Sequence, residues 1–182
     1  MQPYGKSLLT VSFGARGALV RLWSMTGGVT WDAHIPAVGA SGAGAAPPAA
    51  LITGGAIVVA WQSTVRAFHA GSGELLWKWA QDGATMLALL TPSAPSTAAA
   101  TTGGAAGSAT IVVPPVQAFC VSKDGDLFVA ALEDGPADKA AKGSKPAASV
   151  SNLLRGGKVS PRTRLVVTLD RTHVAMVDGT GT

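Results

Sequence analysis

The sequence is poor in charged and aromatic residues and has almost no cysteine. Of its 182 residues, 13% are charged and 5% are aromatic, and Cys120 is the single cysteine. A lone cysteine forms no disulfide within the chain, so cysteine usage indicates no redox compartment. Cys120 stands in an apolar run at 116–121, where we expect a small buried side chain rather than a reactive thiol.

Long apolar runs and clustered charge are also missing. The longest apolar run, residues 56–61, is far shorter than the roughly 20 residues that a membrane-spanning helix needs, and it suits a buried strand. The first residues lead directly into a predicted strand, so no signal peptide is expected. The net charge is +4, but the basic residues are scattered and form no stripe between aromatics. We therefore do not expect nucleic-acid binding.

The sequence shows no recognisable catalytic or metal-binding pattern. His34, His69 and His173 fall in different predicted strands and have no metal-ligand spacing. The segment 124–126 (Asp-Gly-Asp) lacks the rest of a calcium loop, and the loop 14–17 is not followed by the Gly-Lys-Ser/Thr of a phosphate-binding loop. We expect a non-enzymatic protein without metal or cofactor, whose histidines are surface or turn residues.

A repeat stands out in place of these features. Residues 19–31 and 64–77 each contain a strand, a glycine turn and a closing tryptophan. Val20 and Val65 are 45 positions apart, and Trp31 and Trp77 are 46 apart. A period near 45 residues is typical of a β-propeller blade. Residues 116–128 are a degenerate third copy, in which Phe128 replaces the tryptophan.

The repeat predicts an all-β fold, a partial β-propeller of about two to three blades and of quinoprotein-like type. We expect one domain over residues 1–182. It is interrupted by disordered Ala/Gly/Pro-rich loops at 38–50, 92–109 and 135–150. The expected strands are 7–13, 18–24, 29–35, 56–61, 65–70, 74–79, 110–113, 116–121, 127–132, 165–169 and 173–177.

The repeated residues have a structural interpretation. Glycine adopts the positive φ angles of tight turns at no steric cost. A blade cannot bury both of its faces alone, so we expect the closing tryptophans to pack between blades rather than to stack on a ligand. The predicted structural residues of the repeat are Trp23, Gly27, Gly28, Trp31, Phe68, Gly73 and Trp77.

The repeats resemble those of quinoprotein-type propellers. Within that group, residues 7–80 are similar to the amino-terminal propeller of subunit 1 of the endoplasmic reticulum membrane protein complex. The resemblance rests on the following residues in order: Thr10, Val11, Ser12, Gly14, Arg16, Arg21, Trp23, Gly27, Gly28, Trp31, Asp32, Phe68, His69, Ser72, Gly73, Leu76 and Trp77.

This resemblance implies a lumenal scaffold at the endoplasmic reticulum membrane. Such a scaffold would contact the other subunits of the complex and client membrane proteins, and would support the insertion of transmembrane segments without being an enzyme. The signal sequence, first propeller strands and membrane anchor of that family have no counterpart here. The chain therefore resembles a fragment or a truncated gene model, and no membrane-inserting residue carries over from the family.

Two alternatives stay open. The first is a fragment of a quinone-dependent dehydrogenase, although that enzyme would be expected to have adjacent cysteines and an acidic calcium site. The second is a bacterial envelope scaffold of the same propeller type.

Two or three blades leave sheet edges exposed. We therefore expect the isolated chain to be marginally stable or prone to aggregation. Thermal unfolding followed by circular dichroism measures this, and a sharp, reversible transition of a monomer would contradict it.

Overall fold

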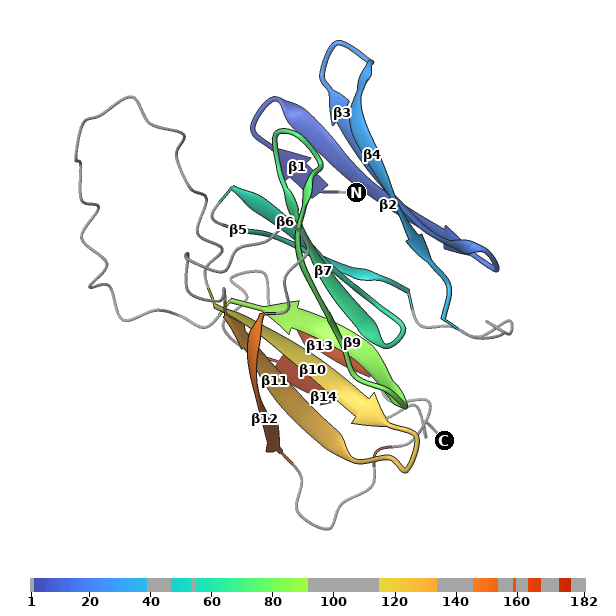
Figure 1. Cartoon of the computed structure of the whole chain (residues 1–182), viewed down its shortest axis with the longest axis vertical. Helices are drawn as coiled ribbons and strands as arrows, with labels where there is room; N and C mark the ends of the chain where they lie inside the picture. Colours follow the sequence, from blue (N-terminus) through green and yellow to red (C-terminus); the bar gives the residue numbers. More distant parts are fainter. Residues whose placement is uncertain are drawn as a thin grey trace, which may run out of the picture.

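The computed structural model describes residues 2–38, 47–53, 55–91, 115–133, 146–153, 159, 164–167 and 174–177. All regular elements in these ranges are β-strands, and Figure 1 shows them as a stack of antiparallel sheets. The predicted strand at 110–113 and the predicted loop at 92–109 lie outside the described residues. So do 39–46 and 135–145, which make up most of the other two predicted loops.

In the described ranges three sheets have four strands each, and within each sheet every strand is hydrogen-bonded to the next one along the chain. The first sheet contains β1 (Gln2–Tyr4), β2 (Ser7–Gly14), β3 (Gly17–Ser24) and β4 (Val29–Pro36). The second contains β5 (Ala49–Thr53), β6 (Ala56–Trp61), β7 (Thr64–His69) and β8 (Leu75–Ala80). The third contains β9 (Ala84–Leu90), β10 (Val116–Ser122), β11 (Leu127–Glu133) and β12 (Ala147–Asn152). A separate hairpin is formed by β13 (Arg164–Val167) and β14 (Val174–Val177).

Two apolar cores hold the three sheets face to face. One core lies between the first and second sheets and includes Leu9, Val20, Ile57 and Val59. The other lies between the second and third sheets. In β6 all six side chains are buried, because the second sheet is covered on both faces. In β3 buried positions alternate with half-buried ones, because the first sheet has only one covered face.

The arrangement of the first strands establishes the architecture. β5 of the second sheet contacts β9 of the third, and β9 contacts β13 of the terminal hairpin. Each sheet is thus a meander that packs face to face on the next, and these first strands lie beside one another. This is a partial β-propeller with three four-stranded blades and a further two-stranded hairpin.

The sequence-based prediction missed four of the strands in the described ranges: β1, β5, β9 and β12. β9 reads Ala-Thr-Met-Leu-Ala-Leu-Leu, which is rich in good helix formers, yet pairing with β10 holds it as a strand. β12 is fully exposed, so it has no alternation of apolar and polar positions that could be recognised. Two predicted loop boundaries were also wrong, since residues 49–50 belong to β5 and 147–150 to β12.

Candidate functional site

A turn closed by the same amide-to-carbonyl hydrogen bond occurs in all three sheets. It joins the third and fourth strands of the first two sheets (β3–β4 and β7–β8) and the second and third strands of the third sheet (β10–β11). In the first sheet the Ser24 amide donates to the Gly28 carbonyl at 2.8 Å. In the second sheet the His69 amide donates to the Glu74 carbonyl at 2.8 Å, and in the third the Ser122 amide donates to the Asp126 carbonyl at 2.9 Å. Each turn has a glycine at positive φ: Gly27 at 95°, Gly73 at 72° and Gly125 at 84°. These positions require glycine because a β-carbon opposes such angles.

His69 is a turn residue and occupies the place of a serine. The hydroxyl of Ser122 accepts hydrogen bonds from the amides of Asp124 and Asp126 within the third turn. In the second turn, Nδ1 of His69 accepts from the amides of Gly71 and Ser72 at 3.1 and 3.0 Å. The second turn is one residue longer, and the larger imidazole spans it. The other two histidines are elsewhere: His34 is exposed in β4, and His173 lies outside the described residues.

Trp31 joins the first sheet to the second. Its indole is 8% exposed, and its Nε1–H donates a buried hydrogen bond of 2.8 Å to the carbonyl oxygen of Ala70 in the second sheet. The ring centroid lies 6.2 Å from that of Phe68, with the planes tilted by 33°. Trp31 thus combines a large buried ring with a satisfied polar atom across an inter-sheet contact. We call this contact, made of Trp31, Ala70 and Gly73, the tryptophan joint.

Gly73 is the residue of the tryptophan joint against which the Trp31 ring lies. A β-carbon at Gly73 would lie 2.6 to 2.8 Å from three ring atoms of Trp31, which is closer than real side chains approach. The absence of a side chain therefore allows the indole to lie against the turn. Gly73 is fixed by two independent constraints, its positive φ and the ring above it.

The corresponding tryptophan of the second sheet is placed differently. Trp77 pairs with Ala67 as Trp31 pairs with Leu22, and it is 3% exposed in the core between the second and third sheets. Its Nε1 is buried and has no hydrogen-bond partner among the residues that the structure describes. The contact between the second and third sheets therefore includes the buried Trp77 ring but no hydrogen bond from its Nε1–H. Phe128 has the same offset from its turn, opposite Cys120, but it lies in the third strand of its sheet, whereas Trp31 and Trp77 lie in fourth strands.

The register also corrects the predicted alignment of the third repeat. In the sequence, residues 116–119 are similar to residues 65–68, which aligns Phe119 with Phe68. In the structure Phe68 pairs with Leu75 at the turn, and the residue in that place of the third sheet is Val121, which pairs with Leu127. Counted from the turn, the alignment was displaced by two positions, because the second turn is longer and β4 and β8 pair through a bulge that the β10–β11 pairing lacks. The third repeat is also one strand out of place, since β10 and β11 are the second and third strands of their sheet.

Trp23 takes no part in the tryptophan joint. It lies on the opposite, uncovered face of the first sheet, where its Nε1–H donates to the Thr10 hydroxyl at 2.9 Å. The guanidinium of Arg21 is 5.9 Å from the Trp23 ring centroid, and its Nε is 3.7 Å from a carboxylate oxygen of Asp32. Both members of this ion pair are substantially exposed, so the pair adds little stability. Gly27 and Gly28 belong to the adjoining turn.

The second sheet has two positive charges where the first has an ion pair. Arg66 pairs with Lys78 across β7 and β8, in the register position that Arg21 and Asp32 have in the first sheet. Within the described part of the chain, Nε of Arg66 is buried without a hydrogen-bond partner, and burial lowers the pKa of its guanidinium. Like charges directly opposite one another in a sheet are destabilising.

Replacing Lys78 by glutamate is expected to stabilise the protein by about 0.5–1 kcal/mol, because an opposite charge then faces Arg66. Urea unfolding of the wild type, Lys78→Glu and the neutral control Lys78→Gln measures this. The expected order of stability is Glu above Gln above Lys. A glutamate variant no more stable than the glutamine variant would show that Arg66 does not interact with this position.

Cys120 is buried in the core between the second and third sheets. Its Sγ lies 3.1 Å from Sδ of Met86, and burial raises the pKa of the thiol to about 12. The thiolate is the reactive form, so Cys120 is expected to be inert in the folded protein.

We expect no reaction of Cys120 with a thiol reagent at pH 8 in the native state and complete reaction in urea. Because folding raises this pKa, the contribution of Cys120 to stability is full below pH 9 and is lost as the pH rises from about 9 to 12. The loss is at most about 1.4 kcal/mol per pH unit and should be absent in Cys120→Ala. Labelling of the folded chain at the rate of a free thiol would contradict the buried position.

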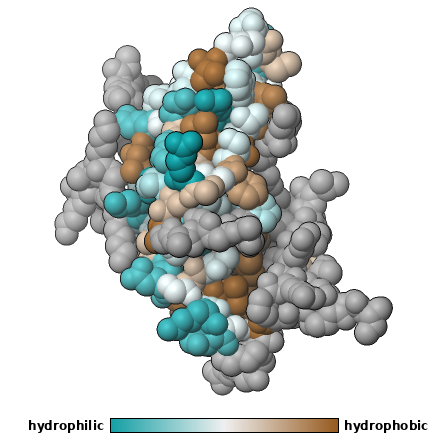
Figure 2. Space-filling view, turned by 90° about the vertical axis from the view of Figure 1, so that its right-hand side faces the viewer, coloured by the Kyte–Doolittle hydropathy of each residue, from teal (hydrophilic) through white to brown (hydrophobic). Residues whose placement is uncertain are grey.

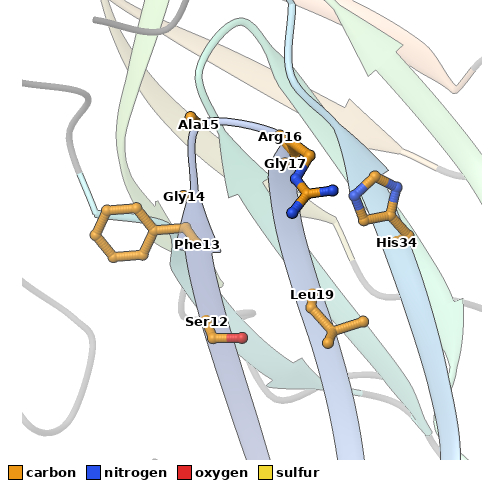
Figure 3. A pocket seen from close by; sticks show the side chains of 8 residues that line it. All are labelled: Ser12, Phe13, Gly14, Ala15, Arg16, Gly17, Leu19 and His34. Atoms are coloured by element: carbon orange, nitrogen blue, oxygen red, sulfur yellow. The ribbon is translucent and has the colours of Figure 1, made fainter. Parts of the chain in front are cut away.

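An open hollow lies at the other end of the first sheet. Its volume is about 300 Å³, and it is lined by Ser12, Phe13, Gly14, Ala15, Arg16, Gly17, Leu19 and His34. Figure 3 shows the side chains of Arg16 and His34 on the same side of the β2–β3 hairpin, with Phe13 pointing away from them. A β-carbon at Gly17 would collide with the His34 ring, so the glycine allows His34 to lie over the hairpin. The lining residues include no carboxylate and no cysteine.

No group of three or more histidine, cysteine, aspartate or glutamate side chains that could hold a metal ion occurs within the described ranges. Among those same residues, no helix has the length and apolar character to cross a membrane.

The comparisons with known proteins are sparse. No protein-family model matches the chain, and no curated protein matches it in sequence. Among solved structures, the chain is similar to the WD40 domain of SCAP from fission yeast, with 8% sequence identity and a TM-score of 0.39. That similarity covers 98% of this chain and 44% of the WD40 domain, so the chain spans less than half of the other protein's length. The propeller architecture rests on the sheet order and the inter-sheet cores, because a similarity this distant adds nothing to them.

Proposed function

We propose that this chain is a non-catalytic scaffold segment, part of a propeller on the lumenal side of the endoplasmic reticulum membrane. In this proposal it belongs to the endoplasmic reticulum membrane protein complex and holds other subunits while client proteins insert their transmembrane segments. The residues that carry the resemblance to subunit 1 of that complex are the source of this specific assignment.

The observation that carries the scaffold proposal is the tryptophan joint. In a ligand-binding propeller, an aromatic ring would be available to a ligand, whereas the ring of Trp31 is buried against Gly73 and its N–H is bonded to Ala70. The residues that recur most clearly along the sequence thus connect one sheet to the next. A rigid stack of sheets with exposed faces and turns is suited to holding partner proteins.

Affinity purification of the tagged full-length protein from detergent-solubilised microsomes of its own cells tests the proposal. The expected result is co-purification of the other subunits of the complex in fixed ratio. Trp31→Ala is expected to abolish this co-purification, whereas the exposed-site variant Lys78→Gln should retain it. Recovery of the protein in the soluble fraction, without those subunits, would overturn the assignment to the complex.

A second measurement separates the scaffold role from the particular complex. If the protein co-purifies in fixed ratio with a different set of proteins, and Trp31→Ala abolishes that association, the scaffold role stands and the assignment to the complex falls. If the purified chain changes the absorption spectrum of an added quinone cofactor in the presence of calcium, the scaffold role itself falls in favour of a dehydrogenase fragment.

A further inference from the structure

The turn of the first sheet has backbone hydrogen bonds that correspond to those of the turn that receives Trp31, although it is one residue shorter, and it is exposed. We propose that this turn is a docking site for a tryptophan presented by a β-strand of another protein surface. Three residues define the site: Met25, Gly27 and Val29, here called the indole site. This inference goes beyond the proposed scaffold function and does not depend on which complex the chain belongs to.

Backbone hydrogen bonds establish the correspondence between the two turns. The Met25 amide donates to the Lys6 carbonyl at 3.0 Å, and the Ala70 amide donates to the Gly55 carbonyl at 2.8 Å. The Gly27 and Gly73 amides each donate back to the first residue of their turn, at 3.0 and 2.8 Å. Val29 pairs with the last-but-one residue of β3, and Leu75 pairs likewise with β7. Met25, Gly27 and Val29 therefore correspond to Ala70, Gly73 and Leu75.

The two sets differ in what covers them. Ala70 is 1% exposed, Gly73 lies against the Trp31 ring, and Leu75 packs on the core. Met25 is 74% exposed and Val29 is 46% exposed. A β-carbon built at Gly27 would meet no atom within 4 Å.

The three positions are thus covered in the second sheet, two of them by the Trp31 indole, and open in the first. By the same correspondence, the Met25 carbonyl occupies the place of the Ala70 carbonyl, which accepts the hydrogen bond from Trp31.

The residues on the uncovered face beside the indole site indicate which side chains the rest of the partner strand should carry. Leu8 and Trp23 pair next to the turn and are apolar, whereas Thr10, Arg21 and Asp32 follow further along the strands. On the covered face of the second sheet, the position of Thr10 is held by Val59. The partner strand should therefore be apolar at the end that bears its tryptophan and polar beyond it. Figure 2 shows apolar residues interspersed with polar ones in the upper part of the molecule, which contains the first sheet.

A second folded copy of this chain does not supply the indole. Four of the five tryptophans, at positions 31, 61, 77 and 79, are buried in the two cores. The fifth, Trp23, is half-buried, and its N–H is bonded to Thr10. The proposed occupant is therefore a strand from a different sheet, whose tryptophan is free to enter the site as Trp31 enters the second sheet.

A hairpin peptide of residues 17–36 is the probe, because this is the element that places Trp31 on Gly73 in the intact protein. It is cyclised so that its two strands are preformed, and it is added to the full ¹⁵N-labelled chain up to about 1 mM. The expected result is saturable chemical-shift change centred on the amides of Met25, Gly27 and Val29. The same peptide with alanine in place of its tryptophan is the matched control and should give no saturable change.

The variant Met25→Asp tests the site from the protein side. Met25 is exposed, so the folded spectrum should be retained, while the affinity for the peptide should fall at least tenfold because a charge then meets the indole. Equal binding of the alanine peptide, shift changes confined to other surfaces, or no saturable change at the highest concentration would each overturn the proposal. Shift changes at the site caused by dimerisation without peptide would assign the face to a second copy instead.

Discussion

Replacing Trp31 by alanine is expected to lower the free energy of unfolding by about 3–5 kcal/mol, the usual cost of truncating a buried tryptophan. The ring fills the interface between the first two sheets, and its N–H satisfies the Ala70 carbonyl. Because single domains are stable by only about 5–15 kcal/mol, such a loss should be enough to separate the first sheet from the second. Urea unfolding followed by circular dichroism and tryptophan fluorescence measures the effect.

Phenylalanine substitutions separate the ring from its hydrogen bond. Trp31→Phe and Trp77→Phe remove the same volume from two corresponding buried positions, but only Trp31 has a partner for its Nε1–H. Trp31→Phe leaves the Ala70 carbonyl without that donor, so we expect it to cost about 1–2 kcal/mol more than Trp77→Phe. Equal losses in the two variants would contradict the role of the Trp31 hydrogen bond.

Gly73→Ala is the second change with a large expected effect, a loss of about 2–5 kcal/mol. Part of the loss, about 1–2 kcal/mol, arises because an L-residue is strained at φ of 72°. The remainder, about 1–3 kcal/mol, arises because the new methyl group displaces the Trp31 ring. Thermal and urea unfolding of the purified variant measure the total.

Gly27→Ala is the matched control. Gly27 also has a positive φ, of 95°, but the space around it is open, so this variant should lose only the backbone part. In a Trp31→Ala background, Gly73→Ala should cost no more than Gly27→Ala, because the ring that it displaces is gone. If Gly73→Ala and Gly27→Ala cost the same in the wild-type background, the indole does not lie against the turn.

The parts of the fold that could be predicted from the sequence are those specified by residues a few positions apart, such as turns and the strands beside them. A glycine at a turn and a tryptophan a few residues later recur because the first two sheets each have this turn between their third and fourth strands and bury the tryptophan against the next sheet. The repeat therefore located β3, β4, β7 and β8 closely. Two of the strands that were not predicted show why: β9 is rich in residues that favour helices, and β12 is exposed throughout, so neither has a recognisable alternation of apolar residues.

The roles of individual side chains depended on which faces the fold covers. Trp23 and Trp31 look alike in the sequence, but Trp31 is buried between two sheets and Trp23 lies on the uncovered face. The alternation of side chains along β3 and β4 separates two faces of the sheet, but it does not indicate which face packs against the next sheet. His69 was expected at the surface or in a turn. Its role as the acceptor for two turn amides follows from a turn length that only the pairing of β7 and β8 reveals.

Nuclear Overhauser contacts of the Trp31 indole test the central claim most directly, that this ring joins two blades by lying against a glycine turn. If it does, the ring protons should show contacts to the α-protons of Gly73, and those α-protons should be shifted upfield by the ring current. The Nε1 proton of Trp31 should also exchange slowly, because it is buried and bonded to Ala70. Gly73 α-protons that resonate where those of Gly27 do, without contacts to the indole, would contradict the joint and the blade packing built on it.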